Sequence, residues 1–217
     1  MGYTVIAPVG DNPKALFAGM KEFPAERVIL LTPYDYGVEA KKLQEKLDSF
    51  AIKSEIIELN GNVLESTFRI FGNLAAMNDP DNLVVNVATG DRMSTMACLS
   101  ASYANGLRAL GVADGRSFLL PVMKLSYYSE ISGNKLKVLR ALEGSEPVSL
   151  KVLAKKVSIS ISLLSYHING NLKYMGLKEF RLVETKEKSK NVFASLTQMG
   201  NLLLKGYAEK KLSGQRV

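Results

Sequence analysis

The sequence has one cysteine, one histidine and no tryptophan among its 217 residues. Cys98 alone can form neither an intramolecular disulfide nor a thiolate metal cluster. His167 alone lacks the partner ligands that a zinc site requires. We therefore expect no metal site, and a chain with so little cysteine is typical of the reducing cytoplasm.

Long apolar runs and targeting signals are also missing. No stretch approaches the roughly 20 apolar residues that a membrane-spanning helix needs. The first residues lack the basic start and apolar stretch of a secretion signal. We therefore expect a cytoplasmic protein without a membrane partner.

The two best-known glycine-rich phosphate loops are absent as well. No Gly-x-Gly-x-x-Gly follows the first expected strand, and no Gly-Lys-Ser/Thr loop occurs in the chain. Interpretations as a dinucleotide oxidoreductase or a P-loop enzyme therefore lose their main support.

Positive charge is concentrated in the second part of the chain. The formal net charge is +7, but residues 1–130 carry 12 Lys/Arg against 15 Asp/Glu, whereas residues 131–217 carry 16 against 6. This asymmetry predicts two domains with different partners, 1–130 and 131–217. The basic one is the candidate for binding a polyanion, although a lysine-rich surface can also serve solubility alone.

The first part alternates short apolar segments with amphipathic ones, which predicts an α/β domain with a mostly parallel sheet. The expected strands span 3–9, 27–32, 53–59, 83–87, 109–112 and 117–122, and the expected helices span 13–23, 38–50, 63–77 and 92–106. Such sheets bind ligands at the carboxyl ends of their strands. This directs attention to the loops at 10–12, 32–37 and 88–94.

The turn after the fourth expected strand is the most informative of these loops. Gly90 allows the backbone to approach a ligand closely, the N–H groups that follow it can face an anion, and Arg92 offers a fork of donors. An ordinary strand-to-helix turn with a surface arginine would look the same. The candidate ligand-binding residues are Gly10, Asp11, Asn12, Asn86, Thr89, Gly90 and Arg92.

The second part contains two short helices around a polar turn. Ser149 and Ser160 are placed as N-caps, and Gly176 is expected to end the second helix. Helical spacing gives that helix an apolar face of Ile161, Leu164, Ile168, Leu172 and Met175. Its polar face carries Ser162, Tyr166, Asn169 and Lys173. Short polar and basic side chains suit base edges and phosphates in a major groove, but a packed helical hairpin would show a similar pattern.

A basic hairpin is expected directly after the helix pair. Two β-branched segments, at 182–185 and 192–197, flank Lys186, Lys188 and Lys190, which are placed to contact a nucleic acid backbone. Thr197 is expected to cap a last helix. This order, including the Leu-Thr-x-x-Gly entry to the last helix, resembles the winged helix-turn-helix domains of archaeal and bacterial regulators. The candidate DNA-binding residues are Ser160, Ser162, Tyr166, His167, Asn169, Lys173, Lys186, Lys188 and Lys190.

The whole chain resembles the CARF–winged-helix regulators of archaeal CRISPR systems, whose CARF domain is a Rossmann-like sensor. Asn86 and Arg92 match the ends of that family's Asp/Asn-x-Ser/Thr-x-x-x-Arg/Lys pattern, whereas Ala88 stands where Ser or Thr is usual. Gly10 and Asn12 are placed as in the family's ligand-binding loop. The resemblance implies a homodimer that binds a nucleotide-type anion, in many relatives a cyclic oligoadenylate, with no other cofactor.

Three functions remain open from the sequence. The preferred hypothesis is a ligand-responsive transcriptional regulator that binds double-stranded DNA and has no catalytic residues. The second is an enzyme that degrades a cyclic oligonucleotide, for which Asp11, Asp35 and Asp91 are candidate carboxylates. The third is a module that binds single-stranded RNA.

Overall fold

The computed structural model of the chain describes residues 2–121, 131–188 and 191–206. The described residues form two compact units, residues 2–121 and residues 131–205. Each unit has its own core. In the described residues, no helix combines the length and the apolar character that crossing a membrane requires.

The first unit is a Rossmann-like α/β fold, so the expected mostly parallel sheet is confirmed. Its strands are β1 (Tyr3–Pro8), β2 (Ala25–Pro33), β3 (Lys53–Leu59), β4 (Leu83–Asn86), β5 (Arg108–Ala113) and β6 (Arg116–Leu119). They lie in the order β3-β2-β1-β4-β5-β6, in which only β6 runs antiparallel to its neighbour. The end of the last expected strand, at Val122, falls outside the described residues.

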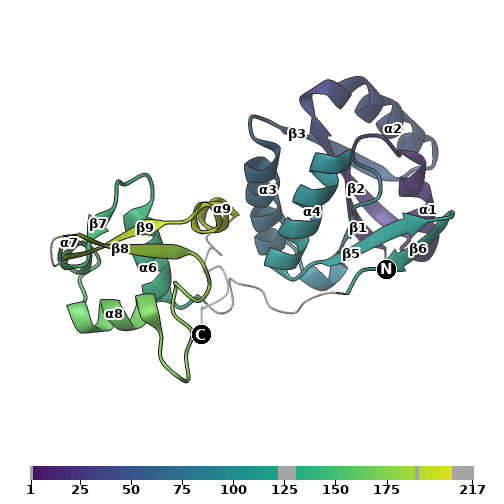
Figure 1. Ribbon diagram of the computed structural model, residues 1–217. Coiled ribbons are helices and arrows are strands. Elements are labelled where there is room, and N and C mark those ends of the chain that lie inside the picture. The colour runs from purple at the N-terminus through teal and green to yellow at the C-terminus, as the bar shows by residue number, and fades with distance from the viewer. Residues whose placement is uncertain (1, 122–130, 189–190, 207–217) are drawn as a thin grey trace, which may run out of the picture. The chain divides into compact units, whose positions relative to one another are not determined.

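Helices cover both faces of this sheet. They are α1 (Lys14–Glu22), α2 (Gly37–Ser49), α3 (Val63–Met77) and α4 (Arg92–Asn105), with short 3-10 turns η1 (Tyr34–Tyr36) and η2 (Pro80–Asn82). In Figure 1, α3 and α4 lie on one face of the sheet and α1 and α2 on the other. Because both faces are covered, the central strands are continuously apolar, and residues 28–31 of β2 are fully buried.

Helix α4 packs against the sheet through small side chains. Ala97, Cys98 and Ala101 are all 0% exposed. Burial raises the pKa of the Cys98 thiol above its usual value, so this side chain remains a neutral, small core residue.

The second unit combines helices with a small antiparallel sheet. Its helices are α6 (Gly133–Leu142), α7 (Leu150–Lys156), α8 (Ile161–Asn169) and α9 (Gln198–Gly206), and its strands are β7 (Val148–Ser149), β8 (Val183–Lys188) and β9 (Asn191–Leu196). The strand order is β7-β9-β8. Helices α6 and α7 pack against β9, and α8 packs against α6 and α7 (Figure 1). Leu139, Leu153, Leu164 and Ile168 are 0% exposed and form part of its core.

Candidate functional site

The loops after β1 and β4 meet at the point where the strand order of the first sheet reverses. Strand β1 lies between β2 and β4, and the helices that follow β1 and β4 lie on opposite faces of the sheet (Figure 1). Open α/β sheets bind ligands in the crevice outside the carboxyl ends at such a switch point, and the region around these loops is called the crevice below. The structure therefore brings the two sets of predicted ligand-binding residues to one place.

Glycine makes this meeting possible. A Cβ atom at Gly10 would lie 2.2 Å from the backbone nitrogen of Asp91 and 2.6 Å from the carbonyl carbon of Gly90. Gly90 in turn packs against the Pro8 ring, 2.8 Å from where its own Cβ would be. The Asn12 amide donates a hydrogen bond to the Thr89 carbonyl oxygen at 3.2 Å. The two loops are thus held in direct backbone contact.

Asn86 and Thr89 are buried and hold the loops in place. The Asn86 side chain donates to the Ala15 carbonyl at 2.9 Å and accepts from the Ala88 amide at 3.1 Å. The Thr89 hydroxyl donates to the Pro8 carbonyl at 2.6 Å. Their side chains are 0% and 1% exposed, so in this structure both act on the shape of the crevice.

Arg92, by contrast, is exposed at the first position of α4. Asp91 caps this helix by accepting a hydrogen bond from the Ser94 amide at 2.7 Å. Within the described part of the chain no carboxylate pairs with the Arg92 guanidinium. A free guanidinium beside a helix N-terminus can bind a phosphate.

The third loop at this edge, η1, is linked to the first through Tyr36 and Asp11. The Tyr36 hydroxyl donates to the Asp11 carboxylate at 2.9 Å. This bond, followed by desolvation and the negative charges of Asp11, Asp91 and Asp35, raises the pKa of the Tyr36 phenol. The sequence had not marked Tyr36 as a site residue, although its position just after an expected buried strand was the available signal.

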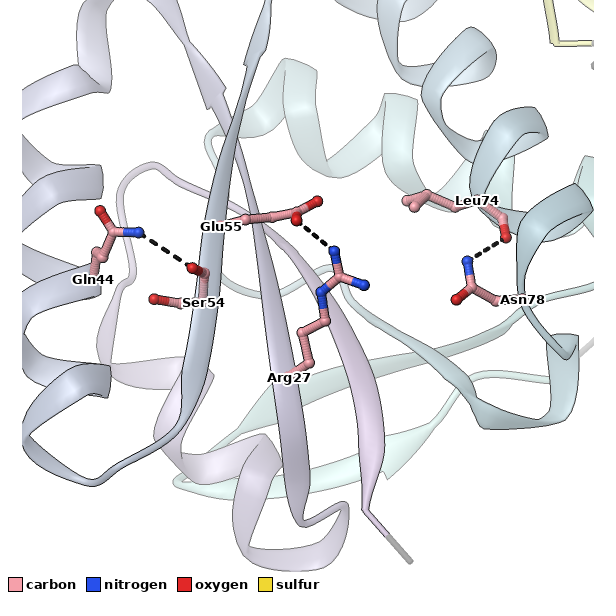
Figure 2. A network of polar contacts seen from close by, with 6 residues as sticks. All are labelled: Arg27, Gln44, Ser54, Glu55, Leu74 and Asn78. Carbon is pink, nitrogen blue, oxygen red and sulfur yellow. Dashed lines mark hydrogen bonds and ion pairs between the residues drawn. The ribbon is translucent and has the colours of Figure 1, made fainter.

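A cleft of about 500 Å³ lies at the opposite, amino edge of the sheet and is lined mainly by polar residues. Arg27 lines it and is paired with Glu55 across β2 and β3. Figure 2 shows this pair together with the bonds from Gln44 to the Ser54 carbonyl and from Asn78 to the Leu74 carbonyl. The first two contacts join neighbouring elements and the third closes the end of α3, and none of the predicted site residues lies there.

The exposed polar face of α8 is the candidate surface of the second unit. Ser160 caps the helix as expected, since its hydroxyl accepts from the Leu163 amide at 3.1 Å. Ser162 and Asn169 are exposed and Tyr166 is half-buried. The Asn169 side chain donates to the Ser165 hydroxyl at 3.1 Å. This face is polar and accessible over two turns of the helix.

The expected length of this helix was wrong. Helix α8 ends at Asn169, because Gly170 has φ +74° and ψ −167°, a conformation that only glycine adopts readily. The Asn171 side chain then accepts from the Lys173 and Tyr174 amides at 2.9 and 2.8 Å and forms a tight turn. Lys173 is therefore exposed on a turn rather than on the helix.

The apolar face of α8 is correspondingly shorter than the sequence suggested. Leu164 and Ile168 are buried as expected, but Leu172 and Met175 lie beyond the helix and are exposed. Ile161, at the first turn, is 49% exposed. The expected core face thus reduces to its two central members.

His167 does not lie on the exposed face, in contrast to its sequence-based assignment as a DNA-binding residue. Its side chain is 8% exposed, and neither ring nitrogen has a hydrogen-bond partner among the described residues. Burial, and then the charge of Lys135, lower the pKa of the imidazole. Lys135 is itself buried and donates to the Met175 carbonyl at 2.7 Å.

This burial predicts a pH dependence of stability. His167 has its ordinary pKa of about 6.5 when unfolded and a lower one when folded, so below pH 6.5 the unfolded chain binds more protons. We expect the free energy of unfolding to be unaffected by His167 above that pH and to fall as the pH drops towards the folded pKa. Urea unfolding at pH 7.5 and pH 5.5 measures this change in the free energy of unfolding.

The matched control is His167→Phe, which keeps a planar ring and removes the titration. Since the chain has a single histidine, the difference between wild type and variant isolates this group. Identical pH profiles would contradict the assignment of a lowered pKa.

The β8–β9 hairpin carries the expected lysines. Lys186 and Lys188 lie on β8 and are exposed, and Lys186 lies 3.5 Å from Glu184. Lys190 falls outside the described residues. Thr197 caps α9 as expected, because its hydroxyl accepts from the Gly200 amide at 3.0 Å. In the described ranges, no group of three His, Cys, Asp or Glu side chains is arranged to hold a metal ion.

Comparison with known proteins gives distant likenesses. No family model matches the chain. An uncharacterized protein of Archaeoglobus fulgidus is 26% identical over 179 residues, which are 75% of this chain and 79% of that protein.

Three solved structures are also similar. They are Can2 from Sulfobacillus thermosulfidooxidans in complex with cyclic tetra-adenylate (16% identity, TM-score 0.45), a Vibrio cholerae protein (12%, 0.44) and a type III CRISPR defence DNA nuclease activated by cyclic oligoadenylate (16%, 0.47). The matches cover 64%, 94% and 86% of this chain. This chain spans 46%, 64% and 36% of theirs.

Proposed function

We propose that the protein is a ligand-responsive, DNA-binding transcriptional regulator that works as a homodimer. The first unit would bind a nucleotide-type anion, and the second would be a winged helix-turn-helix that binds duplex DNA. The observation that carries the proposal is the exposed polar face of α8, followed later in the basic part of the chain by a lysine-bearing hairpin of the same unit. An accessible polar helix and a basic hairpin in one small unit suit base reading and backbone contact together.

The crevice of the first unit supports ligand sensing. Gly10 and Gly90 allow the loops after β1 and β4 to meet at the switch point, and Arg92 adds an exposed positive charge at the start of α4. Met93 and Met96, on the first turns of the same helix, are 52% and 50% exposed. Exposed apolar side chains beside a site suit the contact with a second copy of the chain.

Ligand binding would act by favouring one arrangement of the dimer. A ligand shifts such an equilibrium only by its differential affinity for the two arrangements. In a dimer, the arrangement fixes the spacing of the two recognition helices, which must match the half-sites on DNA. Cyclic tetra-adenylate is the first ligand to test, because the resemblance in the sequence motifs implies it.

The test is binding to the promoter DNA of the protein's own operon, measured by fluorescence anisotropy over a range of salt. Replacing Lys173 and Lys188 with alanine is expected to weaken binding by about tenfold at low salt. Each lost phosphate contact lowers the slope of log affinity against log salt by about 0.9. The double variant should therefore show a slope shallower by about 2.

The control is a double replacement of Lys41 and Lys42, which are exposed on α2 of the first unit. It removes the same charge and should leave the slope unchanged. Unchanged binding by the Lys173/Lys188 variant would contradict the proposed DNA surface. A preference for single-stranded RNA would favour the RNA-binding hypothesis instead.

An enzyme that degrades a cyclic oligonucleotide is the second candidate. It is favoured by the carboxylates of Asp11, Asp35 and Asp91, whose charges all act on Tyr36 at the edge of the crevice. Incubation with cyclic tetra-adenylate followed by chromatography tests it. Turnover that is lost in Arg92→Ala would favour the enzyme, and an intact ligand would favour the regulator.

A further inference from the structure

One aromatic side chain at the carboxyl edge takes no part in the fold. Tyr34, the first residue of η1, is 94% exposed, whereas its neighbours Thr32 and Pro33 are buried. Because the Tyr34 side chain is exposed, its burial contributes nothing to the stability of the fold, and its ring is accessible to a ligand. Aromatic faces stack on nucleobases of any sequence.

The backbone that carries this ring is fixed on both sides. Pro33 is the last residue of β2 and pairs with Leu59 of β3. Two residues after Tyr34, the Tyr36 hydroxyl is bonded to Asp11 of the loop after β1. The ring therefore projects from a short segment held at both ends, which lowers the entropy cost of binding.

The three carboxylates of this edge differ in what they already bind. Asp11 accepts from the Tyr36 hydroxyl, and Asp91 accepts from the Ser94 amide. In the part of the chain that the structure describes, no donor bonds the exposed Asp35 carboxylate. Asp35 is thus the carboxylate left to accept a hydrogen bond from a ligand.

These charges divide the crevice into two chemically different halves. On the β4 side, Asp91 caps the N-terminus of α4, and the exposed guanidinium of Arg92 is the group that can bind a phosphate. On the β2 side, the Asp35 carboxylate repels phosphate but accepts hydrogen bonds from hydroxyl or amine donors. An acidic residue plays a comparable part in dinucleotide-binding α/β folds, where it binds the ribose hydroxyls.

We propose that Tyr34 and Asp35 form the nucleoside half of the site, with the Tyr34 ring stacked on a base and the Asp35 carboxylate accepting from a ribose 2′-hydroxyl. The inference rests on the proposed nucleotide-sensing function. It narrows the ligand class from nucleotide-type anions to ribonucleotides. Inorganic phosphate and deoxyribonucleotides would occupy only part of the site.

The stacking arm of the test compares Tyr34→Ala with Tyr34→Phe in the full-length protein, using calorimetric titration with cyclic tetra-adenylate. Loss of a stacked aromatic weakens binding by about 5- to 150-fold, so we expect at least fivefold for alanine and close to wild-type affinity for phenylalanine. Val38→Ala is the control, because Val38 is exposed near the same edge, on the first turn of α2, but cannot stack.

The ribose arm compares Asp35→Asn with wild type on cyclic tetra-adenylate and on its 2′-deoxy analogue. The loss of the carboxylate removes a repulsion that acts equally on both ligands, so the readout is the ratio of the two affinities: wild type should prefer the ribonucleotide several-fold, and the variant should lose this preference. Thermal midpoints of all variants should stay unchanged, since both side chains are exposed. Chromatography after each titration checks that the ligand is intact.

The possible results distinguish a failure of the nucleotide-sensing function from a failure of the nucleoside half-site alone. A wild-type protein that binds neither compound overturns the nucleotide-sensing function and this proposal with it. A wild-type protein that binds cyclic tetra-adenylate, with Tyr34→Ala and Asp35→Asn equal to it, overturns the nucleoside half-site alone. Equal losses for the ribose and deoxy ligands in Asp35→Asn would overturn the role of the 2′-hydroxyl.

Discussion

Gly170→Ala is expected to unfold the end of α8 and to abolish DNA binding. The φ of +74° and ψ of −167° at this position lie in a region that costs other residues about 1–3 kcal/mol. An added Cβ would also lie 2.5 Å from the Gly176 nitrogen and 2.6 Å from the Tyr174 carbonyl oxygen. Strain and backbone overlap act together here, so the loss of stability should be among the largest for a single methyl group.

The change can be measured by calorimetry and by binding to promoter DNA. We expect a loss of about 3 kcal/mol or more, which in a unit of this size lowers the midpoint by roughly 10 °C or more. Gly133→Ala is the matched control, because a Cβ there meets nothing within 4 Å. A Gly170→Ala protein with the melting curve of the control would show that this turn does not hold the end of α8.

Gly10→Ala is expected to separate the two loops of the crevice and to prevent ligand binding. The new Cβ would overlap backbone atoms of Gly90 and Asp91, which cannot swing away as a flexible side chain can. Overpacking of this kind costs about 1–3 kcal/mol. The loops can relieve it only by moving apart, which displaces the N-terminus of α4 from the first loop.

Titration with cyclic tetra-adenylate and thermal unfolding test this second prediction. Gly37→Ala, at the first residue of α2, adds the same methyl group where nothing lies within 4 Å, and should behave as wild type. Binding retained in Gly10→Ala at wild-type affinity would move the ligand site away from this crevice. Lost binding with a normal melting curve would support a local effect on the site.

The elements of the first unit could be predicted because each carries its own signal. Alternation of apolar strands and amphipathic helices indicated the parallel sheet, and helix α3 was expected at the residues where it occurs, Val63–Met77. The order of the strands depends on contacts between distant segments, so the switch point between β1 and β4 had to come from the structure. The antiparallel direction of β6 also depends on such contacts.

The second unit shows where local signals compete. The caps at Ser149 and Ser160 were predicted and are confirmed, because a cap is decided by residues three positions apart. The end of α8 was misplaced because the apolar spacing continues through Leu172 and Met175, whereas Gly170 and Asn171 close a turn first. His167 was misassigned because it follows Tyr166 directly in the sequence, and its burial, at 8% exposed, had to come from the structure.

The candidate ligand site was only partly visible in the sequence. Gly10, Gly90 and Arg92 were marked by their residue types after expected strands, and the structure brings them together. Asn86 and Thr89 were marked in the same way, but their burial shows that they support the loops from inside. Tyr34 belongs to no recognised motif. It became a candidate only through the exposure of its side chain, which could not be predicted from the sequence.

The buried sulfur of Cys98 has a practical consequence for studying this molecule. A thiol that is fully enclosed and kept protonated reacts slowly with maleimide and other electrophiles. Surface cysteines introduced by mutagenesis can therefore be tagged selectively with dyes or spin labels, without first removing the native one. Slow alkylation of Cys98 itself would in turn serve as a clock for transient opening of α4.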